Sequence, residues 1–573
     1  MRRGLLTSLL GLVSLLCFVQ GASAHAVLEE STPSRGARLQ SAPDVVRFVF
    51  NEPVEASLGA VRVFDTEGEE VQEGGLLRPG DDPNSVGVRL APDLPNGLYT
   101  ATYRVVSADA HPVSGGVTFT VGKPGTGADG FVQGKTISEL LAETETGTVT
   151  EVAFWADRWI GYLAVALAVG ALAWMLTAPA SVPGGAGAPA VAARLRLLVL
   201  VAAAAGILAS LLAIVFQGAI GAGTTFWGAF GSGIPGEVID TRYGTVMLVR
   251  AGAWLLLALL AVVAARRLTR IGPASIVAAA AALVLAASPA FAGHASTRDP
   301  GWLLIPSDIV HVVAMAVWSG GLAAMLWILP AATRPLESAG EKTRTLTDAT
   351  LRFSGIALAC VALIGVSGAI QAIVDVGSVP DLVETQFGRA VSIKIVLFAV
   401  LMAFGAANRT RIVPALVRRL EKAASPGRPG VRLRRSLRIE VLLVVAVLGV
   451  TAALVSYPPP DAVQSGPASG SVVVDDMRVE YTVDPAKVGR NEVHIYVFDD
   501  RTGTPVPVRD MEVSFALPDQ DIAPIEAEAR RAGPGHYVVP AAMLGVKGDW
   551  RAEASMRISE FEEPVARFEV EVE

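Results

Sequence analysis

The sequence predicts a multi-domain membrane protein in which a bundle of about eight transmembrane α-helices separates two small all-β domains. Two observations support this fold class. Of the 573 residues, 52% are hydrophobic and only 18% are charged, which is too apolar for an ordinary soluble protein. The long apolar runs are confined to the middle of the chain, whereas both flanking parts show short segments of alternating hydrophobicity separated by turn residues.

The N-terminus predicts export. Two arginines precede an apolar stretch, and Ala22-Ser23-Ala24 is typical of a signal-peptide cleavage site. We therefore expect residues 1–24 to be a signal peptide and His25 to become the first residue of the mature chain. Lipid attachment at Cys17 is disfavoured, because bulky leucines precede this cysteine where small residues are expected.

Residues 25–122 are expected to form an extracytoplasmic β-domain, and residues 123–150 are expected to form a linker. Turn signals such as Pro95-Asn96-Gly97 separate the strand-like segments. Short strands at this spacing predict a sandwich or barrel. The strand-like segments are 45–50, 60–64, 97–105 and 116–121.

Residues 151–458 form the predicted transmembrane domain, because they contain apolar runs of about 20 residues, enough to cross a bilayer. Lysine and arginine concentrate in the loops after the first, third, fifth and seventh helices, above all in 409–438, which predicts that these loops are cytoplasmic. This orientation agrees with the signal peptide and predicts a multi-pass protein of the cell membrane. The expected spans are 154–177, 193–216, 244–265, 272–292, 307–330, 353–374, 389–408 and 438–456.

The chain turns polar again after the last helix. Residues 459–470 are expected to be a linker, and residues 471–573 an Ig-like β-sandwich on the extracytoplasmic side. His494 and His536 lie in or near strands there, and the simplest interpretation is that they are structural or solvated. The membrane part contains a weak internal sequence repeat, in which Tyr243-Gly244 followed by Arg250 corresponds to Phe387-Gly388 followed by Lys394.

Composition excludes several classes of function. The net charge is −7, and no basic patch combines with aromatic residues, so we expect no nucleic-acid partner. The two cysteines form no CxxC pair, and Cys360 lies inside a predicted helix as an inert thiol. No phosphate-binding loop is present, so this chain does not use ATP to drive transport.

The first candidate site combines His25 with Asp109 and His111. A mature N-terminal histidine offers its α-amine and its Nδ1 to one metal ion, and Asp109 and His111 project to the same side of an extended segment. Three nitrogens and one carboxylate oxygen suit the tetragonal geometry of Cu(II). Zinc, which prefers tetrahedral sites, stays open, as does the alternative of a frayed terminus and an ordinary turn.

This domain resembles the CopC family of exported copper-binding proteins. The resemblance rests on His25-Ala26, on Phe50-Asn51-Glu52-Pro53-Val54, and on the specific stretch from Tyr103 to Gly115 that contains Asp109-Ala110-His111. It implies a Greek-key β-barrel in which His25, Asp109 and His111 bind Cu(II). The methionine-rich Cu(I) site of some members is not expected, because residues 25–150 contain no methionine.

The second candidate site lies in the membrane. His294 follows the fourth helix on its outer side, and Asp308 and His311 lie one turn apart on one face of the fifth helix. Met315 follows one turn later. Ionisable groups are costly in a bilayer and typically mark a transport path, so these residues are expected to line a copper path. The alternative is interfacial capping with Met315 as packing.

Residues 154–456 resemble the CopD family of copper transport proteins, by the stretch from His311 to Leu322, by Val366-Ser367-Gly368 and by Phe387-Gly388-Arg389 with Lys394. The C-terminal domain resembles YtkA-like domains. CopC-like and CopD-like parts in this order imply a non-enzymatic copper protein of the cell membrane. It is expected to capture Cu(II) outside the cytoplasm and to import copper, with Cu(I) as a second form during membrane passage. Its expected partners are the copper ion and the lipid bilayer.

Three alternatives stay open. The first is an extracytoplasmic copper sink or sensor with a structural membrane anchor. The second, ranked last, is an oxidative copper enzyme, since a terminal histidine also chelates copper in oxygen-activating proteins; a site completed by Asp109 leaves less room for oxygen. The third is haem-based electron transfer, which needs paired histidines inside helices, whereas His294 and His311 both lie near one surface.

Overall fold

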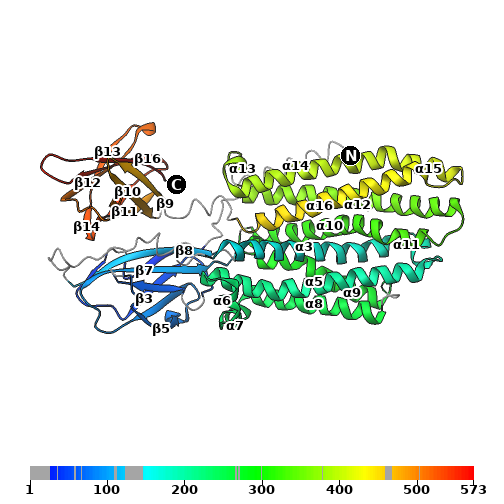
Figure 1. Cartoon of the computed structure of the whole chain (residues 1–573), viewed down its shortest axis with the longest axis horizontal. Helices are drawn as coiled ribbons and strands as arrows, with labels where there is room; N and C mark the ends of the chain where they lie inside the picture. The colour runs from blue at the N-terminus through cyan, green and yellow to red at the C-terminus, as the bar shows by residue number, and fades with distance from the viewer. Residues whose placement is uncertain are drawn as a thin grey trace. The chain divides into compact units, whose positions relative to one another are not determined.

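The computed structural model describes residues 26, 28–34, 37–56, 60–65, 68–108, 112–122, 146–264, 268, 271–298, 300–376, 378–457, 468–484, 486–502, 504–533 and 535–572. Within these residues the chain forms an N-terminal β-domain, a helical bundle and a C-terminal β-domain (Figure 1), which confirms the predicted fold class.

The N-terminal domain consists of two four-stranded sheets around one core. Their orders are β1-β3-β6-β5 and β2-β8-β7-β4, and all pairings are antiparallel except β2 with β8. The strands are β1 (Leu28–Thr32), β2 (Ala37–Leu39), β3 (Val45–Phe50), β4 (Val61–Phe64), β5 (Gln72–Leu77), β6 (Ser85–Leu90), β7 (Gly97–Val106) and β8 (Pro112–Val121), with a 3-10 turn η1 (Pro79–Asp81).

Alternating residues build the core of this domain. Val46, Phe48 and Phe50 of β3 are buried on one face, and Tyr103 of β7 meets two of their rings, with ring centroids 5.0 Å from Phe48 and 5.2 Å from Phe50. A Cβ at Gly115 would overlap the Tyr103 hydroxyl, so the glycine leaves room for the ring. The predicted strands are confirmed, and β1, β2, β5 and β6 are added to them.

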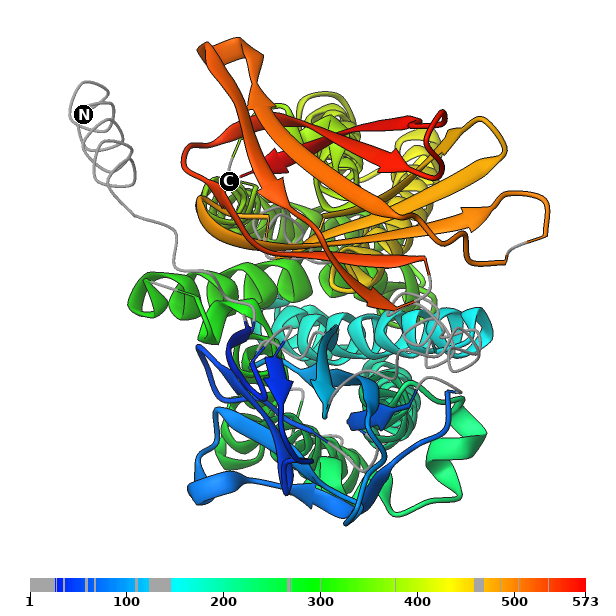
Figure 2. The ribbon, with the colours of Figure 1, turned by 90° about the vertical axis from the view of Figure 1, so that its left-hand side faces the viewer.

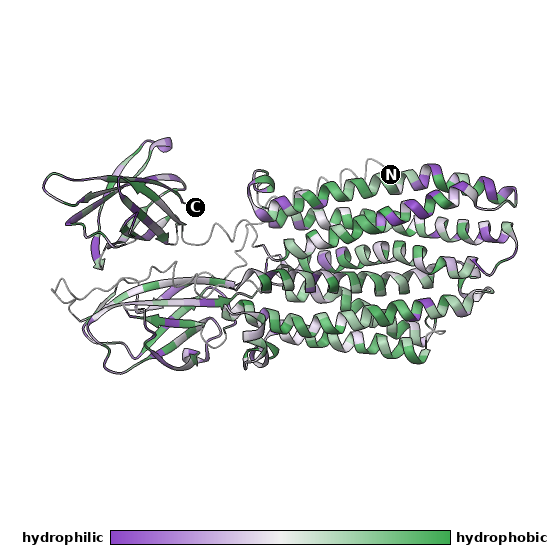
Figure 3. Cartoon of the chain, in the orientation of Figure 1, coloured by the Kyte–Doolittle hydropathy of each residue, from purple (hydrophilic) through white to green (hydrophobic). Residues whose placement is uncertain are grey.

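Eight helices, among the described residues, are long and apolar enough to cross a membrane, the number that the sequence predicts. In Figure 3 the ribbons of these helices are coloured mostly green, which marks hydrophobic residues. The helical elements are α3 (Thr148–Thr177), α4 (Ser181–Gly184), α5 (Ala188–Ala222), α6 (Phe226–Phe230), α7 (Ile234–Ile239), α8 (Arg242–Ala264), α9 (Pro273–Ala292), η3 (His294–Ser296), α10 (Gly301–Trp327), α11 (Leu329–Thr333), α12 (Ala339–Asp375), α13 (Asp381–Glu384), α14 (Gln386–Ala407), the π-turn η4 (Asn408–Ile412), α15 (Val413–Glu421) and α16 (Gly427–Leu454).

Helix α10 packs against α3, α9, α12 and α16. Its contact with α3 is a backbone contact, because a Cβ at Gly320 would overlap the carbonyl oxygen of Ala166, and a Cβ at Gly170 would overlap that of Ala316. The hydrophobic effect does not drive helices together inside a lipid bilayer, so their association depends on close packing. Small residues allow the backbones to approach closely and to gain dispersion energy. On the other side, Gly321 accommodates the ring of Phe353 of α12.

The C-terminal domain is a β-sandwich of a five-stranded sheet, β14-β15-β11-β10-β9, and a four-stranded sheet, β13-β12-β16-β17. Its strands are coloured yellow-orange to red in Figure 2. Val493, Ile495 and Val497 of β11 face the core with Phe515 and Trp550. The strands are β9 (Ala468–Val474), β10 (Met477–Asp484), β11 (Gly489–Asp499), β12 (Asp510–Leu517), β13 (Ile522–Glu528), β14 (Arg530–Gly533), β15 (His536–Leu544), β16 (Gly548–Arg557) and β17 (Val565–Val572), with a 3-10 turn η5 (Pro518–Gln520).

Candidate functional site

The three predicted ligands of the N-terminal domain, His25, Asp109 and His111, lie outside the described residues. The structure describes Ala26, which follows the first of them, and the chain on both sides of the other two. Strands β7 and β8 form a hairpin whose last pair is Val106 opposite Pro112. Ala108, two residues beyond this pair, donates its backbone N–H to Oε1 of Glu52 at 3.2 Å. The chain is therefore anchored immediately before Asp109.

The chain that follows His25 reaches the same end of the domain. Ala26 is buried in the core, and β1 begins with Leu28 opposite Phe50, the last residue of β3. Glu52, which anchors Ala108, follows Phe50 by two residues. The described flanks of both predicted ligand segments thus meet around the end of β3.

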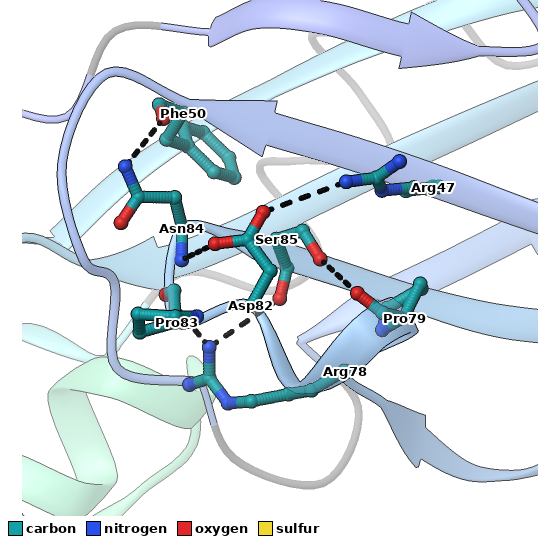
Figure 4. A network of polar contacts seen from close by, with 8 residues as sticks. All are labelled: Arg47, Phe50, Arg78, Pro79, Asp82, Pro83, Asn84 and Ser85. Atoms are coloured by element: carbon teal, nitrogen blue, oxygen red, sulfur yellow. Dashed lines mark hydrogen bonds and ion pairs between the residues drawn. The ribbon is translucent and has the colours of Figure 1, made fainter.

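A polar network holds the end of β3 in place (Figure 4). Arg78 donates to the carbonyl oxygens of Val54 at 2.6 Å and Pro83 at 2.9 Å, and Asn84 donates from Nδ2 to the carbonyl of Phe50 at 3.2 Å. The bonds to Val54 and Phe50 tie the connection between β5 and β6 to the segment that carries Glu52, and the bond to Pro83 braces the connection itself. Burial lowers the pKa of Arg78, opposed by the nearby acidic groups, and the guanidinium stays charged.

In the membrane domain, the structure places His311 of α10 against α12. Its Nδ1 lies 3.0 Å from Oγ of Ser367. That hydroxyl donates its only proton to the carbonyl of Leu363 at 2.7 Å, so it accepts from Nδ1–H of His311. The lone pair of the imidazole is therefore on Nε2. Gly368 makes room for the ring, since a Cβ there would lie 3.2 Å from Cε1 of His311.

Asp308 lies one turn before His311 on the same side of α10. Its Oδ1 accepts from Nε2 of Gln371 of α12 at 3.4 Å. Lys394 of α14 is close enough to interact electrostatically with Asp308 and with Asp375 at the end of α12. The structure therefore brings together the predicted Asp308 and His311 with Ser367, Gln371 and Lys394 from two other helices.

The two remaining predicted path residues differ in position. Met315 is one turn after His311 and is partly buried, and its Sδ lies 3.5 Å from Oγ of Ser319. His294 begins the short turn η3, and its side chain lies outside what the structure describes. Arg298, two residues beyond η3, forms a 3.0 Å ion pair with Asp375.

The weak sequence repeat corresponds to a structural repeat. Just before α8, Thr241 accepts from the N–H of Gly244, and a Cβ at Gly244 would overlap the carbonyl of Val238 in α7. Just before α14, Thr385 accepts from the N–H of Gly388, and a Cβ at Gly388 would overlap the carbonyl of Asp381 in α13.

Each repeat carries a cation six residues after its glycine. Arg250 of the first repeat interacts electrostatically with Asp157 of α3, whereas Lys394 of the second interacts with Asp308 of α10. Each repeat therefore pairs a basic residue with an acidic one. In the second repeat, the acidic residue Asp308 lies on the helix that also carries His311 and Met315.

Sequence reasoning missed a third cluster, in the C-terminal domain. His494 and His536 are buried, and Nδ1 of the first lies 3.0 Å from Nε2 of the second. Of the two roles expected for these histidines, structural or solvated, their burial excludes the solvated one. They are 42 residues apart in sequence, and only the pairing of β11 with β15 brings them together, so no local signal pointed to them.

Across the described residues, no group of three or more histidine, cysteine, aspartate or glutamate side chains is arranged to hold a metal ion. Cys360 is free and buried, as predicted. In the membrane domain, the described candidate residues offer the imidazole nitrogen of His311 and the thioether sulfur of Met315. Both groups are ligands for copper.

Comparisons with known proteins agree with this chemistry. The family model described as "CopC domain" matches residues 28–122, "Copper resistance protein D-like, N-terminal domain" matches 149–305, and "Copper resistance protein D" matches 348–454. The resemblance of the C-terminal domain to YtkA-like domains stays a prediction.

Similar proteins have copper-related names. Copper transport protein CutJ of Bacillus subtilis (strain 168) is 30% identical over 488 residues, which cover 84% of this chain and 83% of that protein. Copper resistance protein D of Pseudomonas syringae pv. tomato is 28% identical over 259 residues, covering 44% of this chain and 81% of that protein.

Among solved structures, CopC from Methylosinus trichosporium OB3b is 30% identical, with a TM-score of 0.16, and covers 18% of this chain and 98% of that chain. The alignment with CutJ spans 84% of this chain, and the family models match a CopC region followed by CopD regions. The chain therefore belongs to the family of copper transport and resistance membrane proteins in which a CopC domain precedes a CopD domain.

Proposed function

We propose that this protein captures Cu(II) outside the cytoplasm through His25, Asp109 and His111, and imports copper across the membrane by way of His311. The observation that carries the proposal is the 3.0 Å contact between Nδ1 of His311 and Oγ of Ser367. With Nδ1–H donated to Ser367, the ring offers its Nε2 lone pair inside a membrane bundle, which is the form that binds a metal ion.

The anchored flanks of the outer segments support the first step. Ala26 and Ala108, the described residues next to His25 and Asp109, both belong to the end of the domain where β3 finishes, and this shared location is what supports an outer site formed by the three residues. An amine, two imidazoles and a carboxylate would give Cu(II) a tetragonal N/O set.

Residues next to His311 support the second step. Asp308 supplies a negative charge one turn from the imidazole, and Met315 supplies a thioether one turn in the other direction. A cation passing along α10 would exchange its water for these groups in succession.

The proposal also assigns the domain boundaries and the orientation of the chain in the membrane. Residues 25–122 and 471–573 are the extracytoplasmic domains, and residues 151–458 are the membrane domain. The arginine-rich connection between α14 and α16 faces the cytoplasm, in line with the positive-inside rule.

Cellular copper accumulation tests the proposal. His25→Ala, His111→Ala and His311→Ala are each expected to reduce accumulation to the level of cells that lack the protein. The matched control is Thr451→Val, which removes a hydroxyl bonded only within α16 and is expected to accumulate copper normally.

The same variants separate import from sequestration. If the two outer variants lose Cu(II) binding by the purified protein while His311→Ala leaves accumulation unchanged, the protein is an outer sink, and the import proposal is wrong. If mass spectrometry shows that the mature chain does not start at His25, the outer site is wrong.

A further inference from the structure

A carboxylate is buried in the membrane bundle near the end of α14, where the arginine-rich segment begins. Glu440 of α16 is 2% exposed. Its Oε1 accepts from Nδ2 of Asn408 at 2.5 Å and from Oγ of Ser436 at 3.0 Å. Among the described residues these two contacts, both with neutral groups, are the hydrogen bonds of this side chain. The import path proposed above does not include this group.

No basic side chain within the described part of the chain offsets the charge of Glu440. The groups that act on its carboxylate are Ser436 and Asn408, and no described charged residue of α3, α10, α14, η4 or α15, the elements packed against α16, does so. Arg409 instead donates to the hydroxyl of Ser354 in α12. An ionised carboxylate buried in a membrane bundle without a basic partner is costly, and binding a proton relieves that cost.

The amide that contacts Glu440 has an acceptor to spare. Oδ1 of Asn408 is buried and has no hydrogen-bond partner among the described residues, whereas buried polar atoms are normally paired. A proton on Glu440 would supply the missing donor, because rotation of the amide lets Oδ1 accept from the carboxyl O–H. The pair therefore has two hydrogen-bonded forms that differ by one proton. The amide donates to the carboxylate in one form and accepts from the carboxyl group in the other.

Asn408 lies at a place where the helix is irregular. It begins the π-turn η4, which separates α14 from α15. Single π-turns are rare and are frequent at functional sites. A change in the hydrogen bond between Asn408 and α16 therefore acts at the joint between α14 and α15.

The groups around the carboxylate favour a proton over a metal ion. Copper sites use imidazole, thiolate or thioether groups, and the described contacts of Glu440 include none of them. Ca²⁺ and Mg²⁺ take about six or more oxygen ligands, whereas an N–H and an O–H donor already face this carboxylate. A proton needs only the carboxylate itself and one acceptor.

Helix α14 connects this carboxylate to the copper path proposed on α10. Lys394 and Asn408 are about four turns apart, so they lie on one face of α14 at a separation of about 21 Å. Between them, Phe398 of α14 meets Trp318 of α10 edge-on, with ring centroids 6.2 Å apart. This aromatic pair lies between the polar cluster that contains Lys394 and the one that contains Asn408.

We propose that Glu440 binds and releases a proton at the cytoplasmic end of the bundle, and that its charge controls how fast copper leaves the path. The carboxyl O–H bond breaks, the electron pair stays on the carboxylate, and the proton passes to water on the cytoplasmic side. The ionised form attracts a copper cation past the aromatic pair, and the protonated form does not. The proton site stands on the contacts of Glu440, whereas its link to copper rests on the proposed import function.

Infrared difference spectroscopy of the full-length protein in detergent, without copper, tests the proton site. Mild acidification leaves exposed carboxylates ionised. Wild type is expected to gain the C=O band of a buried, protonated carboxyl group, and Glu440→Gln is expected to lack this band. Asn408→Leu removes the acceptor and is expected to shift the frequency of the band. Glu421→Gln, at the exposed end of α15, is the control and is expected to match wild type.

Copper uptake into membrane vesicles of native orientation tests the link to transport. The pH inside the vesicles, the proposed cytoplasmic side, is varied while the outer pH is held constant. Wild type is expected to take up copper about 10-fold faster with an alkaline than with an acidic interior, because the ionised carboxylate attracts the cation. Glu440→Gln is expected to be slow at both, and Glu440→Asp, which keeps an ionisable group, is expected to regain the dependence.

Two outcomes would overturn the proposal. If the infrared band persists in Glu440→Gln, this residue is not the proton site. If wild type and Glu440→Gln respond equally to the inner pH, its charge does not control copper. Wild-type vesicles that take up no copper would contradict the import proposal and the link to transport, while the infrared result would still decide whether Glu440 binds a proton.

Discussion

Side chains on a neighbouring helix set the chemistry of the membrane histidine. His311 and Asp308 were predictable, because their spacing places them on one face of one helix. Ser367 was visible in the sequence only as part of a family-like stretch, and nothing local showed that its hydroxyl accepts from Nδ1. That contact links positions 56 residues apart, and it depends on how α12 packs on α10.

Substituting Ser367 tests that contact. Ser367→Ala is expected to slow copper uptake by about 10–100-fold, because the imidazole loses the acceptor that fixes its tautomer. Ser367→Thr keeps a hydroxyl and is expected to restore most of the rate. Equal uptake by wild type and Ser367→Ala would show that the contact has no part in transport.

Acid is expected to destabilise the C-terminal domain through His536. The folded domain keeps this imidazole neutral among Glu492, His494 and Tyr496, whereas the unfolded chain binds a proton below about pH 6.5. The unfolded state then binds more protons, so stability is full above this pH and falls as the pH drops below it.

Hydrogen exchange of the amides in β11 and β15, corrected for the intrinsic pH dependence, measures this effect. Protection is expected to decrease between pH 7.5 and 5.5 in metal-free wild type and to change much less in His536→Gln. The prediction fails if both proteins lose the same protection.

At the scale of elements, Arg78 holds the connection between β5 and β6 to the end of β3. Arg78→Ala leaves the carbonyls of Val54 and Pro83 without this donor and is expected to destabilise the N-terminal domain by about 1–3 kcal/mol. Urea unfolding of a secreted 25–122 fragment measures the change. Arg62→Ala, which breaks a solvent-accessible ion pair with Glu70, is the control and is expected to cost less than about 1 kcal/mol.

The contact between α3 and α10 is expected to tolerate no side chain at Gly320. Gly320→Ala introduces a methyl group onto the carbonyl of Ala166, which forces the helices apart and lowers the melting temperature in detergent. Gly355→Ala, where a Cβ meets nothing within 4 Å, is the matched control and is expected to be neutral or slightly stabilising. Equal melting temperatures would show that the helices adjust.

At the scale of the whole molecule, the sequence was sufficient to predict the fold class and the number of membrane spans. Both follow from patterns averaged over many residues, namely hydropathy and the alternation of polar and apolar residues. The sequence was insufficient for the ends of the elements. Helix α12 starts at Ala339, fourteen residues before the predicted span at 353–374, because its first turns are polar and hydropathy does not detect them. Strands β1 and β2 are short, and their pairing depends on distant residues.

Single-cysteine labelling tests the orientation of the whole chain. The mature chain is expected to contain only the buried Cys360, so a membrane-impermeant maleimide should label introduced cysteines alone. Asp519→Cys, on the exposed surface of the C-terminal domain, is expected to react in intact cells. Ser425→Cys, between α15 and α16, is expected to react only after the membrane is opened. The reverse pattern would invert the proposed topology.

The glycine contact between α3 and α10 also limits how copper transport can proceed. The backbones of the two helices touch at Gly170 and Gly320, and separating them would open a void. We therefore expect α3 and α10 to move as one unit. His311 is carried by that unit, while its hydroxyl partner belongs to α12. Exposure of the imidazole first to one compartment and then to the other is therefore expected to come from displacement of α12 and α14, with the histidine itself nearly stationary.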